Sequence, residues 1–136
     1  MTLLTHLQIV GVLLVLLGGA NVLLPRYFNW ERDLTAVPLF TRRVFWVHLV
    51  FLVITLELFG WATLLNAGAL LEPGPLSRTM LAGMAIFWWT RLLCQFFVYE
   101  PELWRGDPFR TRIHYGISVF WMYLAGTYTA ALYRVW

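Results

Sequence analysis

The chain has 136 residues, of which 60% are hydrophobic and only 12% are charged, and its mean hydropathy is +0.69. Soluble domains carry about 25% charged residues, so this composition excludes an ordinary soluble catalytic domain. The net charge is +3 and every basic residue is an arginine, but no basic run or basic–aromatic patch indicates binding to nucleic acid.

Four long apolar stretches separated by short polar hinges account for nearly the whole chain. They cover residues 7–24, 44–65, 76–99 and 113–133. A helix needs about 20 apolar residues to cross a bilayer, and continuous apolar runs favour helices over the alternating strands of a barrel. The sequence therefore predicts an all-α membrane protein, a four-transmembrane-helix bundle with short loops that forms one integral membrane domain over residues 1–136.

The first stretch follows an amino-terminal segment without the basic region of a cleavable signal peptide, so we expect a retained span that stops at Pro25. Small residues on this span favour the close approach of a neighbouring helix, and they are Gly11, Gly18, Gly19 and Ala20. In the first hinge, Asn29 is expected to cap a short interfacial helix over residues 30–33. A plain loop is the alternative.

The arginines predict the orientation of the spans. The first and third hinges hold seven of them, namely Arg26, Arg32, Arg42, Arg43, Arg105, Arg110 and Arg112, and the opposite side holds Arg78 and Arg134. The positive-inside rule then places the first and third hinges in the cytoplasm and both termini outside. The expected location is the bacterial cytoplasmic (inner) membrane, in a multi-pass arrangement.

Few polar side chains lie inside the predicted spans, and their depths suggest a site. His48, Gln95 and His114 are each expected about a turn inside the cytoplasmic end of their span. Arg91 lies one turn deeper than Gln95, and Glu57 lies roughly 20 Å deep. Because intramembrane polar groups usually face the interior of a bundle, we expect His48, Arg91, Gln95 and His114 to line a ligand-binding pocket near the cytoplasm, with Glu57 as a candidate deeper partner. A pairing of Arg91 with Glu57 is left open.

Three functional interpretations fit this pattern. The first is a small membrane subunit, or a protein that binds a lipid-type ligand, with membrane lipids and other membrane subunits or copies of itself as partners. The second is a redox anchor that binds haem b or a quinone, with His48 and His114 as the haem iron ligands. The third is an enzyme acting on a membrane lipid or isoprenoid, but no catalytic motif supports it and the residues indicate no confident metal site. In the first two interpretations, an anionic headgroup or the haem propionates would contact the hinge residues Arg42, Arg43 and Arg112.

Three segments resemble a group of small bacterial four-span proteins. They are residues 24–30 (LPRYFNW), 38–48 (PLFTRRVFWVH) and 87–99 (FWWTRLLCQFFVY). The resemblance implies the four-span fold over most of the chain, and it brings no activity, substrate or cofactor with it.

Overall fold

The computed structural model describes residues 1–136, apart from the side chain of Leu103. The described chain is helical, which confirms the all-α prediction. Its elements are α1 (Leu3–Tyr27), α2 (Trp30–Asp33), the 3₁₀ turn η1 (Leu34–Ala36), α3 (Leu39–Leu65), α4 (Ala67–Leu70), α5 (Pro75–Phe97), η2 (Pro101–Leu103) and α6 (Pro108–Val135).

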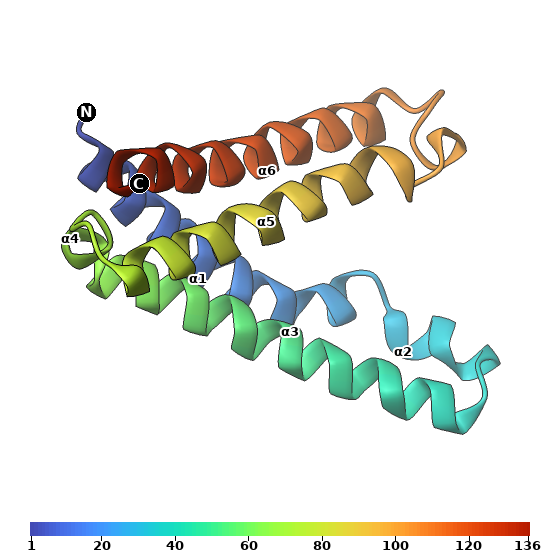
Figure 1. The fold of residues 1–136 in the computed structure, drawn as a ribbon. Helices are drawn as coiled ribbons and strands as arrows, with labels where there is room; N and C mark the ends of the chain where they lie inside the picture. The colour runs from blue at the N-terminus through green and yellow to red at the C-terminus, as the bar shows by residue number, and fades with distance from the viewer. The chain divides into compact units, whose positions relative to one another are not determined.

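The chain divides into two compact units, and each is described by itself. The α1–α3 unit comprises Gln8–Asn66, and the α5–α6 unit comprises Met1–Leu7 together with Ala67–Trp136. Figure 1 shows α1 beside α3 in the first unit and α5 beside α6 in the second. The single domain over residues 1–136 stays a prediction.

Helices α1 and α3 approach each other through glycines. A Cβ atom added to Gly11 would lie 2.7 Å from the Cβ of Leu64, and one added to Gly60 would lie 2.7 Å from Cγ2 of Val15. A Cβ at Gly18 would collide with the Glu57 carboxylate. The expected close approach is therefore confirmed at Gly11 and Gly18, and it also uses Gly60 of α3. The space around a Cβ at Gly19 is open, so Gly19 does not take part in this approach.

Helices α5 and α6 pack along two stripes of residues at helical spacing. Trp88 of α5 stacks on Trp121 of α6, with ring centroids 5.4 Å apart and planes within 12°. On α6, His114, Ser118, Trp121 and Ala125 are all buried, as expected for residues spaced three or four apart on one face.

A proline starts each of these two helices, and a carboxylate caps α6. Pro75 and Pro108 each stand at the beginning of their helix, where the missing N–H costs no hydrogen bond. Asp107 caps α6, because its carboxylate accepts hydrogen bonds from the backbone N–H groups of Phe109 and Arg110. Helix α6 therefore begins five residues before the predicted fourth span.

Three boundary predictions require correction. Pro25 does not stop the first helix, because α1 continues to Tyr27, and a proline in the last turn removes only one hydrogen bond. The helix of the third predicted span, α5, ends at Phe97 and not at Tyr99. The predicted short helix over residues 30–33 is present as α2, but the side chain of Asn29 makes no capping hydrogen bond. Asn29 instead takes a left-handed conformation with φ of 55°, which asparagine adopts more readily than most residues.

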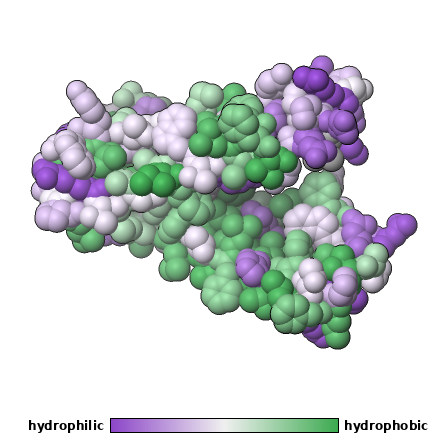
Figure 2. Space-filling model, turned by 45° about the vertical axis from the view of Figure 1, so that its right-hand side comes forward, coloured by the Kyte–Doolittle hydropathy of each residue, from purple (hydrophilic) through white to green (hydrophobic). Residues whose placement is uncertain are grey.

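Within the described chain, three helices are long and apolar enough to cross a membrane, namely α1, α3 and α5. Only 11% of the most apolar part of α3 is buried, and Figure 2 shows extensive apolar surface. Helix α6 is longer, at 28 residues, but it is richer in tyrosine and arginine and falls outside this set. The three spans are therefore confirmed by length and composition, and the fourth is not.

Candidate functional site

The structure brings three of the five predicted site residues together between α5 and α6. Gln95 is 6% exposed and its Nε2 atom lies 3.1 Å from Nδ1 of His114. Arg91 donates from Nη1 to Oε1 of Gln95 at 3.5 Å. A guanidinium has only donors, so the Gln95 oxygen faces Arg91 and its NH₂ group faces His114. Nδ1 of His114 then accepts from this NH₂ group.

Aromatic rings enclose this polar cluster of Arg91, Gln95 and His114. The ring of Trp104 stacks on His114 at a centroid distance of 4.3 Å. The guanidinium carbon of Arg91 lies 4.7 Å from the centroid of the Trp121 ring, a distance at which cation–π attraction is effective. The cluster therefore has its polar partners within the α5–α6 unit, and its immediate effect is to tie the two helices together.

Buried tryptophan N–H groups without a hydrogen-bond acceptor lie around the polar cluster. Among the described residues, the indole Nε1 atoms of Trp88, Trp104 and Trp121 are buried and have no acceptor. Unsatisfied buried donors cost on the order of 1–3 kcal/mol each. Trp88 and Trp121 lie about two turns from Gln95 and His114 along their helices, and Trp104 stacks on His114.

The other two predicted site residues, His48 and Glu57, belong to the α1–α3 unit. His48 is exposed, and its Nδ1–H donates to the carbonyl of Val44 in its own helix at 2.8 Å. Glu57 accepts from the indole N–H of Trp61 at 3.1 Å and lies against Gly18 of α1. A shared site of His48 or Glu57 with Arg91, Gln95 and His114 stays a prediction, as does iron ligation by the two histidines.

The three arginines expected to contact anionic groups are placed differently from one another. Arg42 folds back so that its Nη2 donates to the carbonyl of Val37 at 3.3 Å. Arg43 and Arg112 are exposed. Exposure leaves the guanidinium groups of Arg43 and Arg112 available to lipid phosphates, whereas Arg42 is partly committed to the turn before α3.

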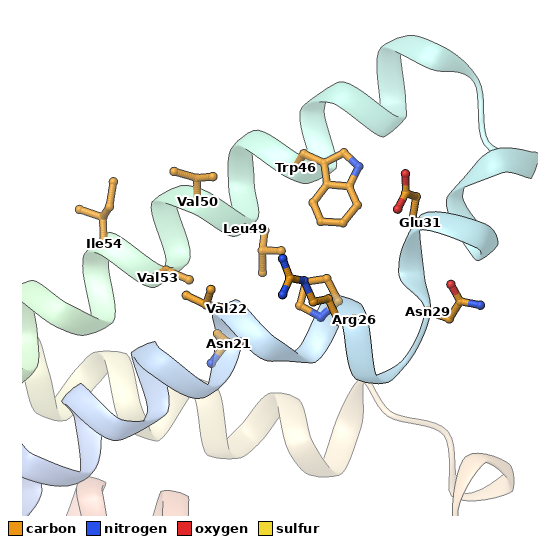
Figure 3. Close-up of a pocket in the computed structure, with 11 residues that line it drawn as sticks. Asn21, Val22, Arg26, Asn29, Glu31, Trp46, Leu49, Val50, Val53 and Ile54 are labelled. Carbon is orange, nitrogen blue, oxygen red and sulfur yellow. The ribbon is translucent and has the colours of Figure 1, made fainter.

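A pocket that the sequence did not indicate lies within the α1–α3 unit. It has a volume of about 730 Å³, and Figure 3 shows side chains from the end of α1, from the turn and α2 after it, and from residues 46–54 of α3 around it. The lining residues are Asn21, Val22, Pro25, Arg26, Asn29, Glu31, Trp46, Leu49, Val50, Val53 and Ile54. We call this pocket the α1–α3 groove.

The turn between α1 and α3 closes one end of the groove. Helix α1 ends at Tyr27, Asn29 turns the chain in a left-handed conformation, and α2 begins at Trp30. The N–H of Asn29 donates to the carbonyl of Arg26 at 3.3 Å, which keeps this turn tight. As a result, both Arg26, before the turn, and Glu31, after it, line the groove.

The groove is polar at the end near the turn and apolar at the other. Figure 3 shows Arg26, Glu31 and Trp46 towards the former end and Val53 and Ile54 towards the latter. We call the three polar residues near the turn, Arg26, Asn29 and Glu31, the mouth of the groove. Among the described residues, none of these three side chains has a hydrogen-bond or ion-pair partner. The amide of Asn21, farther along α1, donates to the carbonyl of Leu17 at 2.8 Å.

Sequence reasoning missed the groove because its lining carries no periodic signal. The apolar residues of α3 resemble those of any membrane span, and in sequence Arg26 is one of the arginines that indicate topology. A usable signal was the mixture of a guanidinium, a carboxamide and a carboxylate within the six residues 26–31 beside an apolar span.

Comparison of the chain with protein-family models, with curated proteins and with solved structures gives no match. The resemblance to small bacterial four-span proteins therefore stays a prediction.

Proposed function

We propose that the protein is a multi-pass protein of the bacterial inner membrane that binds one membrane lipid in the α1–α3 groove. The observation that carries this proposal is a groove of about 730 Å³ with apolar walls and a polar mouth. Ligand sites usually have volumes of about 300–1,000 Å³, mostly apolar linings and a few polar groups that fix the ligand.

A membrane location is supported by the helices themselves. Helices α1, α3 and α5 have the required length and composition, and the exposed apolar part of α3 needs apolar surroundings. In α6, the 21 residues 113–133 between Arg112 and Arg134 contain no Asp, Glu, Lys or Arg. They extend over roughly 32 Å, which matches a hydrocarbon core of about 30 Å. We therefore include α6 as the fourth span.

The proposed orientation places the mouth of the groove at the cytoplasmic surface. Arg26, Arg32, Arg42 and Arg43 all belong to the first hinge or its flanks, and such arginines are retained in the cytoplasm. Trp46, which lines the groove near its mouth, suits the headgroup level, where tryptophan is enriched. A lipid of the inner leaflet would then enter with its headgroup at Arg26, Asn29 and Glu31.

The physics of the bilayer assigns different roles to the two ends of the groove. Lipid tails are as apolar as leucine, so moving a chain from the bilayer into the groove gains little free energy from the hydrophobic effect. The walls formed by Val22, Leu49 and Val53 therefore admit a chain without selecting it. Selection falls to the polar mouth, where charge-assisted hydrogen bonds are possible.

The exposed face of α3 does not carry the proposal. An apolar face with little burial is covered equally well by lipid or by a partner subunit, so it does not separate a lipid-binding protein from an accessory subunit. The groove separates these two functions, because a partner helix docking on an apolar face does not need the guanidinium and carboxylate of the mouth.

The proposal is tested by filling the groove. The variant Val53→Trp places an indole among the groove walls, and Val47→Trp is the matched control, because Val47 lies on the same helix, is 54% exposed and is not a lining residue. Native mass spectrometry of the detergent-purified proteins would count retained lipids. We expect one bound lipid on the original chain and on Val47→Trp, and loss of most of it on Val53→Trp. Equal retention by both variants would contradict the proposal.

A further inference from the structure

We infer, on the basis of the proposed function, that the α1–α3 groove selects a phospholipid whose headgroup carries both a phosphate and a primary ammonium, as in phosphatidylethanolamine. In this assignment Arg26 binds the phosphate and Glu31 binds the ammonium. Asn29, between them in sequence, supplies an amide that can donate to one group or accept from the other.

The charges of the mouth support a zwitterionic headgroup. One guanidinium and one carboxylate line the same pocket, so their formal charges cancel. A headgroup with only a negative charge would satisfy Arg26 and place its phosphate close to the Glu31 carboxylate. A headgroup with an ammonium beside its phosphate satisfies both side chains.

The side chains of Arg26 and Glu31 are also free to bind. Neither has a hydrogen-bond or ion-pair partner among the described residues. Among the described residues no ion pair joins Arg26 to Glu31, so neither charge is neutralised by the other. Figure 3 shows both side chains towards the same end of the pocket as Trp46.

The turn between the helices places the two charged residues on different helices. Asn29 is left-handed, and Asp33 N–H donates to its carbonyl at 3.3 Å, so α2 starts directly after the turn. Thr35 Oγ1 adds a hydrogen bond to the carbonyl of Arg32 at 2.6 Å. This bonded turn carries Glu31 on α2 while Arg26 remains on α1.

The chemistry of each group explains the preference for a primary amine. Arginine presents a planar fork that binds two phosphate oxygens at once. A primary ammonium donates hydrogen bonds to a carboxylate, whereas a quaternary ammonium such as choline has no N–H and keeps only the charge attraction. We therefore expect phosphatidylethanolamine to be preferred over phosphatidylcholine and over the anionic phosphatidylglycerol.

The test uses the full-length protein in nanodiscs that contain phosphatidylethanolamine, phosphatidylcholine and phosphatidylglycerol in equal amounts. After mild extraction, native mass spectrometry would measure which class stays bound. We expect phosphatidylethanolamine to be enriched over each of the other two by at least about threefold, a modest factor because the mouth is exposed and water screens its charges.

Substitutions separate the roles of the two charges. Glu31→Gln should lower the ratio of phosphatidylethanolamine to phosphatidylglycerol to near one, and Arg26→Gln should lower the retention of all three lipids. Asp33→Asn and Arg32→Gln are the matched controls, because both residues lie on α2 and neither lines the groove. Enrichment of phosphatidylglycerol on the original chain, or equal effects of Glu31→Gln and Asp33→Asn, would overturn the inference.

The outcomes also distinguish this inference from the proposed function. If Val53→Trp removes the bound lipid but Glu31→Gln leaves the lipid ratio unchanged, the groove binds lipid and the headgroup assignment is wrong. If the original chain retains no lipid, or Val53→Trp has no effect, both the proposed function and the headgroup assignment are overturned.

Discussion

Replacing Gly60 by alanine tests the packing that positions the groove. The added Cβ would lie 2.7 Å from Cγ2 of Val15, 2.8 Å from the Val15 nitrogen and 3.0 Å from the Gly11 carbonyl oxygen. Two of these three atoms belong to the backbone of α1, so a side-chain rotation cannot relieve the contact. The two helices must move apart, and the close packing between glycines that drives helix association in membranes is lost.

The expected magnitude follows from a comparison with Gly19→Ala. Both substitutions replace a glycine inside a helix, so both gain about 1 kcal/mol of helix propensity. A Cβ at Gly19 meets open space, whereas overpacking of the kind produced at Gly60 costs about 1–3 kcal/mol. Because the propensity gain is common to both variants, the difference between them is the cost of the collision. Gly60→Ala should therefore be about 1–3 kcal/mol less stable than Gly19→Ala.

The measurement is reversible unfolding in mixed micelles, followed by circular dichroism during a titration with a denaturing detergent. The free energies of unfolding of the two variants and the original chain would be compared under one set of conditions. Gly60→Ala should unfold first, and Gly19→Ala should match or exceed the original chain. Equal stabilities of the two variants would refute the close approach of α1 and α3.

Three further predictions concern the α5–α6 unit and the orientation of the chain. Gln95→Ala leaves His114 without its buried partner and should lower the free energy of unfolding by about 1–3 kcal/mol. Arg134→Ala, on the exposed end of α6, should change this free energy little. Equal unfolding midpoints of the two variants would count against the cluster. Asp107→Ala removes the cap of α6 and should lower the free energy of unfolding by about 1 kcal/mol, with faster hydrogen exchange in the first turn of α6. Asp107→Asn should retain most of the stability. Unchanged hydrogen exchange in Asp107→Ala would show that the cap is dispensable. Reporter fusions in the hinge at residues 33–36 should be active only as cytoplasmic reporters, and periplasmic activity there would reverse the proposed topology.

The helices and one of their interfaces could be predicted from the sequence because both depend on local periodicity. Four long elements follow from the apolar runs, and the stripe of His114, Ser118 and Trp121 follows from helical spacing. The contact of Gln95 with His114 was reached from the expected depth of each residue in its span, and the structure confirms that these two residues meet.

The α1–α3 contacts required information that spacing does not contain. Gly11 and Gly18 marked one side of the contact, but the partner surface at Gly60 depends on the crossing of two helices. The same crossing places Glu57 against Gly18, and the sequence left the face of Glu57 undecided. The groove arises from the crossing of the two helices together with the turn at Asn29, so no continuous run of residues predicts it.

The haem interpretation depends on a relation between two units. His48 lies in the α1–α3 unit and His114 in the α5–α6 unit, and matched depth along the sequence does not bring two imidazoles to one iron. This interpretation stays a prediction, and an absorption spectrum of the purified protein before and after dithionite tests it. A Soret band that shifts on reduction and is lost in His48→Ala and His114→Ala would establish the haem.

The most direct test of lipid binding in the α1–α3 groove is photo-crosslinking with a phosphatidylethanolamine that carries a diazirine near the middle of one acyl chain. After irradiation in nanodiscs, digestion and mass spectrometry would locate the modified residues. We predict that the modifications concentrate on the groove walls at Val22, Leu49 and Val53, and that Val53→Trp lowers them while Val47→Trp does not. Modifications spread evenly over the exposed faces of the helices, and unaffected by Val53→Trp, would contradict the binding of a lipid in the groove.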